Sequence, residues 1–311
     1  MKECVVIYNP QSGKKHKDFI KKIPSIVEEY GYKTLLIYTE YKNHATDIVA
    51  ELPNTIDLVI SIGGDGTFNE TVTGNLKRKK RLLLAHLPAG TTNDIGAIYG
   101  YKDYNNIEEN LRLVLEGEDK KIDLGLINDK PFVYVAGFGK FLNVAYETPR
   151  VMKKNLGYLA YIGGAIKEFF RGFKLYEVEI ETEGKKTRSF YSFGLISNAN
   201  RIAGINQFYK EVKLNDGKLE FLFSNIARHH DLVKVLFHYA KGDVTNAPGL
   251  FFYKTDHMIV RFIDKAPAWC LDGEYNKEKI RRYEIKVDHN FTIRIPRSCQ
   301  KELFIKDEEK R

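Results

Sequence analysis

The sequence predicts two domains, an α/β domain with a parallel sheet followed by a β-rich domain. Its 311 residues exceed the roughly 250–300 residues at which a single hydrophobic core stops growing. Apolar runs alternate with helix-like stretches through residue 124, a pattern typical of repeated βα units. From Gly125 onward, short strand-like runs separated by turns dominate. The first domain is therefore predicted over residues 1–124 and the second over 125–295.

The first domain is predicted to alternate buried strands with amphipathic helices. Its strands are predicted over Cys4–Tyr8, Lys33–Tyr38, Asp57–Ile62 and Leu82–Leu87. Its helices are predicted over Lys15–Tyr30, Thr46–Leu52 and Phe68–Leu76. Because helices separate the strands, the strands are expected to run parallel.

The second domain is predicted to be α+β, with strands in the majority. Its strands are predicted over Pro131–Ala136, Tyr176–Glu181, Ser189–Ser197, Lys218–Phe223, His257–Phe262 and Tyr283–Val287. Two helices are predicted to interrupt them, Leu156–Arg171 and His229–Tyr239.

Composition narrows the class of protein. The formal net charge of +8 favours anionic partners. The three cysteines, Cys4, Cys270 and Cys299, lack the paired spacing of a disulfide framework or zinc site, which predicts a cytoplasmic location. No apolar window approaches 18 residues, so any membrane contact is expected to be peripheral.

The densest motif is Gly63–Glu70, placed between a predicted strand and a predicted helix. Glycines in such a loop allow backbone N–H groups to approach phosphate oxygens. Asp65 would repel a bare phosphate, so its presence indicates that a metal ion or a cationic group mediates the contact. The alternative interpretation is a simple glycine turn that Asp65 caps.

Three other strand ends carry small or polar residues, namely Asn9–Lys14, Thr39 and Pro88–Asp94. In an open parallel sheet these ends lie at one edge, where ligands bind. Lys14 supplies a point charge suited to phosphate. The P-loop pattern and the dinucleotide fingerprint are both absent, so the predicted nucleotide site is of another kind.

Three glycine-containing blocks, Asn9–Lys14, Gly63–Glu70 and Pro88–Asp94, together resemble the diacylglycerol kinase catalytic domain family. The resemblance continues through Ile122–Gly125, Leu214–Leu219 and Leu271–Glu274, and so covers nearly the whole chain. It implies an N-terminal nucleotide-binding α/β domain related to NAD kinases and phosphofructokinases, and a β-rich C-terminal domain. It places the active site in the cleft between them and implies that residues 296–311 rejoin the first domain.

Carried over to matching positions, the resemblance implies a set of ATP contacts. They are Asn9, Pro10, Gln11, Ser12, Gly13, Lys14, Thr39, Gly63, Gly64, Asp65, Gly66, Thr67, Phe68, Asn69, Glu70, Thr91 and Asn93. Asp65, Asp94 and Asp123 resemble an acidic network that holds catalytic Mg²⁺ through ligands and waters.

The resemblance also implies two sites in the second domain. Asp272 or Glu274 is expected to be the general base, the other its metal-linked supporter, while an Asp-Gly turn closing a hairpin is the alternative. A structural Mg²⁺ is expected at Asp216 with the backbone carbonyls of Lys213 and Lys218. Asn215 stands where relatives often carry an acid, and an ordinary Asn-Asp-Gly turn is the alternative there.

The function implied is ATP- and Mg²⁺-dependent phosphorylation of a lipid hydroxyl, with diacylglycerol as acceptor. Asp65, Asp123, Asp272 and Glu274 are the expected catalytic residues. The lipid would be met at the anionic inner face of the membrane by transient peripheral contact. No nucleic-acid-binding module is present, and the sequence leaves homodimer formation open. An NAD kinase, which shares Gly63–Thr67, and a non-catalytic nucleotide- or lipid-binding regulator are the alternatives.

Overall fold

A computed structural model describes most of the chain. The described residues are 1–12, 17–90, 93–101, 103–104, 106–139, 173–202, 205–206, 209, 212–228, 231, 235, 238, 245–276, 278–298 and 303–305. They form two compact units, Met1–Ile122 with Asn290–Lys301, and Asp123–His289 with Glu302–Arg311.

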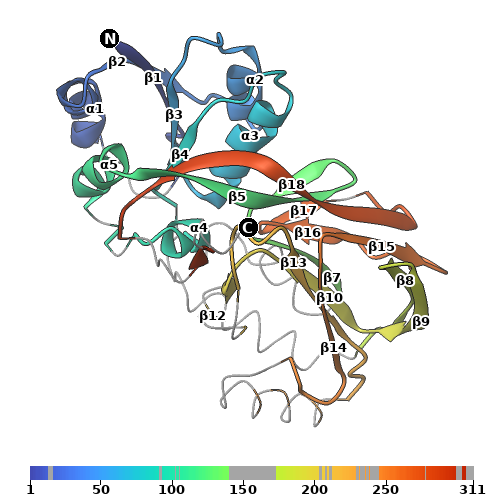
Figure 1. Cartoon of the computed structure of the whole chain (residues 1–311). Coiled ribbons are helices and arrows are strands. Elements are labelled where there is room, and N and C mark those ends of the chain that lie inside the picture. Colours follow the sequence, from blue (N-terminus) through green and yellow to red (C-terminus); the bar gives the residue numbers. More distant parts are fainter. Residues whose placement is uncertain are drawn as a thin grey trace. The chain divides into compact units, whose positions relative to one another are not determined.

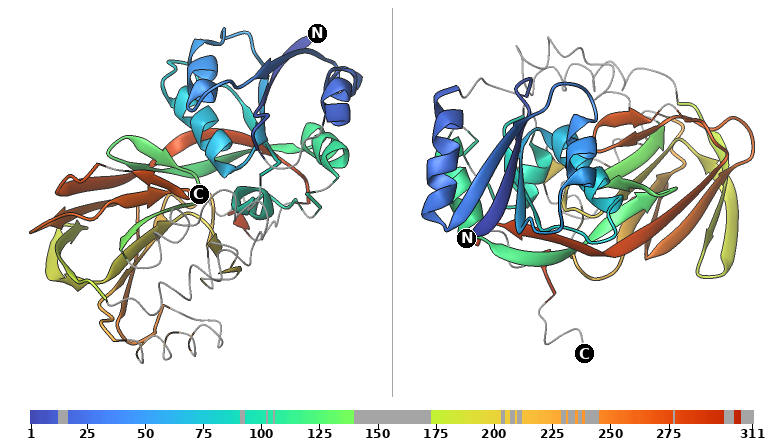
Figure 2. Two further views of the ribbon diagram at one scale, coloured as in Figure 1. Left: turned by 180° about the vertical axis from the view of Figure 1, so that it is seen from behind. Right: turned by 90° about the horizontal axis from the view of Figure 1, so that it is seen from above.

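The first unit is built on a parallel sheet with helices on both faces. Its strands are β1 Lys2–Tyr8, β2 Tyr32–Tyr38, β3 Leu58–Gly63, β4 Leu84–Pro88 and the last residues of β18 Arg282–Ile295, in the order β2-β1-β3-β4-β18. Its helices are α1 Lys17–Glu29, α2 His44–Glu51, α3 Asp65–Leu76, α4 Asp94–Ile98 and α5 Ile107–Leu115. Helices α1 and α5 lie on one side of the sheet and α2 and α3 on the other (Figure 1, Figure 2). Strands β3 and β4 are buried along their whole length, which explains their continuous apolar sequences.

The strand order creates one switch point, between β1 and β3. The chain passes from β1 to β2 on one side and returns to place β3 on the other side of β1. Loops that leave such neighbouring strands in opposite directions open a crevice at their carboxyl ends. The segments after β1 and β3, which begin with Asn9 and Gly64, therefore lie where an α/β sheet binds ligands.

The second unit is a sandwich of antiparallel strands. One sheet has the order β14-β13-β10-β7-β16-β17, and the other continues from β18 through β15 and β8 to β9. The strands are β5 Glu118–Ile127, β6 Lys130–Phe132, β7 Val135–Gly139, β8 Tyr176–Thr182, β9 Lys185–Tyr191, β10 Phe193–Ser197, β11 Arg201–Ile202, β12 Ile205–Asn206, β13 Leu219–Ser224, β14 Leu250–Thr255, β15 His257–Phe262, β16 Trp269–Leu271 and β17 Glu274–Asn276. The predicted fold class, α/β followed by a β-rich domain, is confirmed.

Aromatic side chains from both sheets form the core of this sandwich. Phe138 on β7 lies 4.9 Å from Phe262 on β15, ring centroid to ring centroid, in an edge-to-face arrangement. Trp269 on β16 lies 4.8 Å from Tyr283 on β18. Such pairs contribute roughly 0.5–1.5 kcal/mol each beyond their burial. The two sheets are thus joined by interlocking rings rather than by aliphatic side chains alone.

Three predicted strands are wrong in extent. The run Ser189–Ser197 is divided at Ser192 between β9 and β10. The run Pro131–Ala136 is divided between β6 and β7, because the N–H groups of Val133 and Tyr134 donate to the Asp272 side chain instead of to a neighbouring strand. The strand predicted over Tyr283–Val287 extends to Ile295 as β18. The predicted helix Leu156–Arg171 and most of His229–Tyr239 lie outside the described residues.

The C-terminal segment differs from the expectation that residues 296–311 return to the first domain. Residues 290–301 do belong to the first unit. Leu303, however, accepts a hydrogen bond from the Leu214 N–H at 2.7 Å, and the Ile305 N–H donates to Asn215 Oδ1 at 2.8 Å. These residues are therefore part of the second unit.

Candidate active site

Asn9, the first residue after β1, connects the segments that meet at the switch point through hydrogen bonds. Its N–H donates to the Ile62 carbonyl at 3.0 Å, and its Nδ2 donates to Thr67 Oγ1 at 2.9 Å. Its Oδ1 accepts from the Gln11 N–H at 2.9 Å, and its carbonyl accepts from Ser12 Oγ at 2.7 Å. Asn9 thus ties the loop after β1 to the start of α3. Gly13 and Lys14, the expected phosphate contacts, lie outside the described residues.

The loops after β3 and β4 approach each other through glycine. A Cβ added to Gly90 would lie 2.6 Å from the Gly64 Cα, closer than any side chain allows. A Cβ added to Gly63 would meet the Thr67 side chain at 2.6 Å. The Ala89 N–H also donates to the Gly63 carbonyl at 2.7 Å. The glycines therefore serve close backbone packing, which brings two of the predicted ATP-binding blocks together.

Asp65 is explained by the helix that follows the second block. Its Oδ2 accepts from the Asp94 N–H at 3.1 Å, and its Oδ1 accepts from the Ile95 N–H at 3.3 Å. These N–H groups open α4 and have no partner within the helix, so the carboxylate satisfies them. Asp65 itself remains partly exposed, whereas Asp94 is buried.

The Asp65 side chain fits the expected Mg²⁺. Its carboxylate is held in place by these two N–H groups, and Mg²⁺ is commonly bound by one or two carboxylates together with waters and substrate phosphates. Among the described residues, no cluster of three or more His, Cys, Asp or Glu side chains forms a complete metal site. A site at Asp65 would therefore be completed by the nucleotide and by water.

Several predicted ATP contacts have structural partners instead. The Phe68 ring is fully buried, 4.8 Å from the His86 ring, so it is unavailable to a nucleotide. Asn93 is 3% exposed and folds back onto Gly90, accepting its N–H at 2.8 Å. Glu70 Oε1 accepts from the Asn43 N–H at 2.9 Å and supports the start of α2. These side chains therefore have structural roles, and contact of their segments with ATP stays a prediction.

The remaining predicted ATP residues keep their positions at this edge. Thr39 follows β2 and is buried, with its N–H bonded to the Tyr8 carbonyl at 2.9 Å. Gly66 and Asn69 are partly exposed in the first turns of α3, and Pro10 is exposed beside Asn9. Thr91 lies outside the described residues.

In the second unit, Asp272 and Gly273 form the two-residue turn between β16 and β17. Their φ angles of 46° and 82° are those of a type I′ hairpin, in which Asp-Gly is favoured. The hairpin turn of the alternative interpretation is therefore confirmed, but the surface position that it assumed for both acids is wrong for Asp272, which is buried. A role for its acids in catalysis stays a prediction.

The Asp272 carboxylate is buried and accepts three backbone hydrogen bonds. Its Oδ2 accepts from Val133 at 2.6 Å, and its Oδ1 accepts from Tyr134 at 3.0 Å and Val135 at 3.1 Å. These donors stabilise the ionised carboxylate and fix its position. Glu274, by contrast, is exposed at the start of β17. The two acids thus differ in access to a substrate.

Asp123 holds the turn that precedes β13. Its Oδ2 accepts from the Gly217 N–H at 2.6 Å, and its Oδ1 lies 2.9 Å from His289 Nδ1. Burial raises the pKa of Asp123, and the hydrogen bond from His289 opposes that rise. Asp65 and Asp94 belong to the first unit and Asp123 to the second, where its described bonds fix a turn.

The residues around Asp216 do not fit the expected structural Mg²⁺. Asp216 Oδ1 accepts from the Lys218 N–H at 3.1 Å, and its Oδ2 lies 2.7 Å from Lys254 Nζ. The ammonium also lies 3.3 Å from Glu220 Oε1, whose side chain is fully buried. The Lys254 ammonium thus already neutralises Asp216.

Asn215 has its own explanation. Its Oδ1 accepts from the Ile305 N–H at 2.8 Å and its Nδ2 donates to the Ile305 carbonyl at 3.5 Å. A carboxylate could accept the first of these bonds but could not donate the second. The amide therefore suits attachment of the C-terminal segment.

Sequence reasoning missed the partners that hold these acids, chiefly Asn198, Lys254 and His289. Asn198 Nδ2 donates to the Asp123 carbonyl at 2.5 Å. His289 is flanked by Asp288 and Asn290, a polar run that resembles a loop although it lies within β18. Nothing in their spacing indicates the acids that they contact.

Comparison with known proteins identifies the family. The family model for the diacylglycerol kinase catalytic domain matches residues 3–127. The diacylglycerol kinase of Bacillus subtilis (strain 168) is 30% identical over 277 residues, which cover 88% of this chain and 90% of that protein. The chain belongs to the diacylglycerol kinase catalytic domain family. Membership of a kinase family implies that ATP is the phosphate donor.

Other relatives extend the family match to both units. The diacylglycerol kinase of Staphylococcus aureus (strain bovine RF122 / ET3-1) is 26% identical over 317 residues, covering 99% of this chain and 96% of that protein. Two solved structures from Bacillus anthracis str. Sterne share the fold, with TM-scores of 0.82 and 0.74 at 22% and 20% identity. They cover 96% of this chain and 97% and 98% of their own chains. In this family member, none of the described helices has the length and apolarity needed to span a bilayer.

Proposed function

We propose that this protein is an ATP-dependent lipid kinase that transfers the γ-phosphate to the hydroxyl of diacylglycerol and forms phosphatidic acid. The observation that carries the proposal is the packing of Gly64 against Gly90 at the switch point, with Asp65 fixed beside them. This edge of the sheet combines backbone exposed for phosphate approach with one partly exposed carboxylate. Membership of a diacylglycerol kinase family supports a lipid acceptor.

Each part of the chain has a distinct task in this proposal. The loops after β1, β3 and β4 hold the nucleotide phosphates, and Asp65 helps to hold Mg²⁺, which would neutralise charge on the transferred group. Asp65 is already oriented by the N–H groups of Asp94 and Ile95, so its position requires little reorganisation. Asp272 and Glu274 are the two candidate groups to accept the hydroxyl proton.

Access separates the candidate bases. Glu274 is exposed, whereas Asp272 is 4% exposed and accepts three backbone N–H groups. If Glu274 is the base, Glu274→Gln should lower turnover by the roughly 10²–10⁴-fold that is typical of a lost general base. Folding of the variant should be unchanged. A defect that extra Mg²⁺ partly repairs would instead assign Glu274 to metal support.

The acceptor is met at a membrane in this proposal. A net charge of +8 favours transient binding to an anionic surface. This contact would bring the protein to a substrate that is insoluble in water.

The test is incubation of purified protein with labelled ATP, Mg²⁺ and a panel of hydroxyl lipids in mixed micelles, with NAD in a parallel reaction. Labelled phosphatidic acid is the expected product. Label on NAD, or on none of the acceptors, would contradict the proposal. The first outcome would favour an NAD kinase and the second a non-catalytic regulator.

The matched variant is Asp65→Asn. The amide removes the charge and keeps one oxygen, which can accept from only one of the two α4 N–H groups. The free energy of unfolding is therefore expected to fall by about 1 kcal/mol, while phosphoryl transfer falls strongly. Asp256→Asn makes the same change at an exposed residue in the β14–β15 turn and should leave turnover unchanged. Near-parental turnover in folded Asp65→Asn would exclude Asp65 from the Mg²⁺ site.

A further inference from the structure

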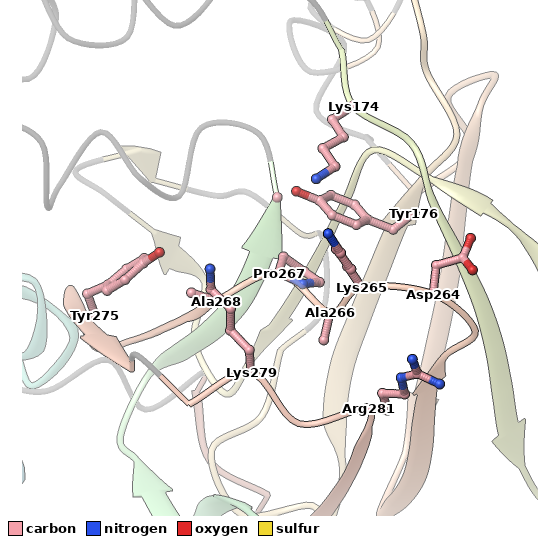
Figure 3. A pocket seen from close by; sticks show the side chains of 11 residues that line it. Lys174, Tyr176, Asp264, Lys265, Ala266, Pro267, Ala268, Tyr275, Lys279 and Arg281 are labelled. Atoms are coloured by element: carbon pink, nitrogen blue, oxygen red, sulfur yellow. The ribbon is translucent and has the colours of Figure 1, made fainter.

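We infer that the second unit carries a binding pocket for a phosphate group, built from residues outside the predicted nucleotide, metal and base sites. The pocket has a volume of about 380 Å³ and is formed by the loop from Asp264 to Ala268, the entry to β8 at Lys174 and Tyr176, and the segment around Lys279 and Arg281 (Figure 3). The inference stands independently of the proposed kinase reaction.

The pocket has more positive than negative side chains in its lining. Four cationic side chains line it, Lys174, Lys265, Lys279 and Arg281, against the single carboxylate of Asp264. Within the described part of the chain, none of the four forms an ion pair. Gathering four cations around one cavity costs electrostatic energy that a bound anion would relieve.

Some other cations of the same unit do have acidic partners. Arg261 lies 2.9 Å from Glu179 and 2.7 Å from Glu181, and Arg188 lies 2.7 Å from Glu177. Basic side chains on these strands thus acquire acidic partners across the sheet. The pocket residues lie instead on loops at one end of the sandwich.

The arrangement of the side chains suits a phosphate. The ammonium ends of Lys174 and Lys265 point toward one another beside Tyr176, and Lys279 enters from another side (Figure 3). Lys174 Nζ lies 5.0 Å from the centroid of the Tyr176 ring, which helps to hold it in place. Burial raises the pKa of Tyr176, so its hydroxyl stays protonated and can donate to an anion.

The volume of the pocket and its small side chains indicate the size of the ligand. Ala266 and Ala268 are each 8% exposed, and with Pro267 they form a small, apolar base. Pockets of roughly 300–1,000 Å³ hold small organic ligands, so the cavity has room for a phosphate together with a group the size of glycerol. The chemical class is therefore a small organic phosphate, and glycerol phosphate, either soluble or as a lipid head group, is the member of this class used as the probe.

The pocket is distinct from the candidate base. Tyr275 lines it, and Glu274 precedes Tyr275 on β17. Successive side chains of a strand point to opposite faces, so Glu274 is directed away from the pocket. Substitutions in the pocket thus leave the proposed proton acceptor in place.

The test measures two probes on the full chain. Calorimetry with sn-glycerol 3-phosphate reports a soluble ligand, and flotation with phosphatidylcholine vesicles, with or without phosphatidylglycerol, reports a lipid head group. Phosphatidylglycerol is neither acceptor nor product of the proposed reaction, so failure of the kinase assay would not affect this result. The variant is Lys265→Gln with Lys279→Gln, and the control is Lys33→Gln with Lys185→Gln, both exposed.

The pocket variant is expected to weaken binding of at least one probe by about tenfold or more, as for the loss of charge-assisted hydrogen bonds, while the control pair stays within about twofold of the parent. Weakening of the soluble probe alone assigns a free ligand, and weakening of vesicle binding assigns a lipid head group. Lys265→Arg, which keeps the charge, should retain binding. Equal losses in the pocket and control variants, or no binding of either probe by the parent, would overturn the inference.

Discussion

Glu220 is predicted to make the second unit less stable as pH rises. Its side chain is fully buried on β13, opposite Lys254 on β14. Burial raises the pKa of Glu220 from the ordinary 4.5 to about 8, and the nearby Lys254 ammonium offsets only part of that rise. The folded state therefore binds this proton more tightly than the unfolded state, and stability is lost as pH rises toward 8.

The size of the effect follows from these two pKa values. Each pH unit between them costs about 1.4 kcal/mol, so the free energy of unfolding should fall by about 3–4 kcal/mol between pH 5 and pH 8 from this group alone. Glu220→Gln keeps the shape and removes the titration. The variant should match the parent near pH 5 and become increasingly more stable than the parent toward pH 8.

The assay is urea unfolding at several pH values, followed by tryptophan fluorescence. The chain has a single tryptophan, Trp269, which is fully buried in the second unit, so its emission reports the unit that contains Glu220. Glu183→Gln, at an exposed position of the β8–β9 turn, is the matched control and should keep the parental pH dependence. Parallel curves for the parent and Glu220→Gln would refute the reasoning.

Three further outcomes are expected. Lys254→Gln should lower the melting temperature, because Asp216 and Glu220 lose their cationic partner. Added Mg²⁺ or Ca²⁺ should restore part of the melting temperature of the variant and leave that of the parent unchanged. A metal-dependent shift in the parent would show that it binds a structural ion. Gly90→Ala should cost about 1–3 kcal/mol and weaken ATP binding by equilibrium dialysis, because its Cβ would overlap Gly64. Asp272→Asn should destabilise the fold by about 1–3 kcal/mol in thermal melts, whereas Glu274→Gln should not, and equal melting temperatures would argue against the buried N–H cage.

The sequence was sufficient to predict β1 to β4 and α1 to α3 of the first unit, whereas α4, α5 and the part of β18 that joins its sheet were not predicted. Strands such as β3 are buried on both faces, and that condition leaves a continuous apolar run. The edge at which the glycine-containing blocks meet could be predicted because the strands are connected in parallel. Local turn chemistry was equally readable, since Asp272-Gly273 does form a two-residue hairpin.

Contacts between distant residues were beyond the sequence. Asp272 accepts from Val133, which precedes it by 139 positions, and this contact interrupts a run that otherwise reads as one strand. Arg78 lies in the basic run Lys77–Arg81, yet its guanidinium donates to the Val49 carbonyl at 2.9 Å and to Asn54 Oδ1 at 2.8 Å, at the end of α2. No local pattern distinguishes such a bond from a solvated charge.

Three of the acids that the sequence predicts to be catalytic share one structural property. Asp65, Asp123 and Asp272 each accept hydrogen bonds from backbone N–H groups of a segment distant in sequence. A carboxylate held in this way has its orientation set before any ligand arrives, which is the condition for electrostatic stabilisation with little reorganisation. The same bonds make each acid part of the fold. Loss of activity on substitution is therefore informative about chemistry only when the N–H groups keep an acceptor. For this reason Asp65→Asn is a more specific test than Asp65→Ala. For the same reason a substitution of the exposed Glu274 tests proton transfer more directly than a substitution of Asp272, which is held by three N–H groups.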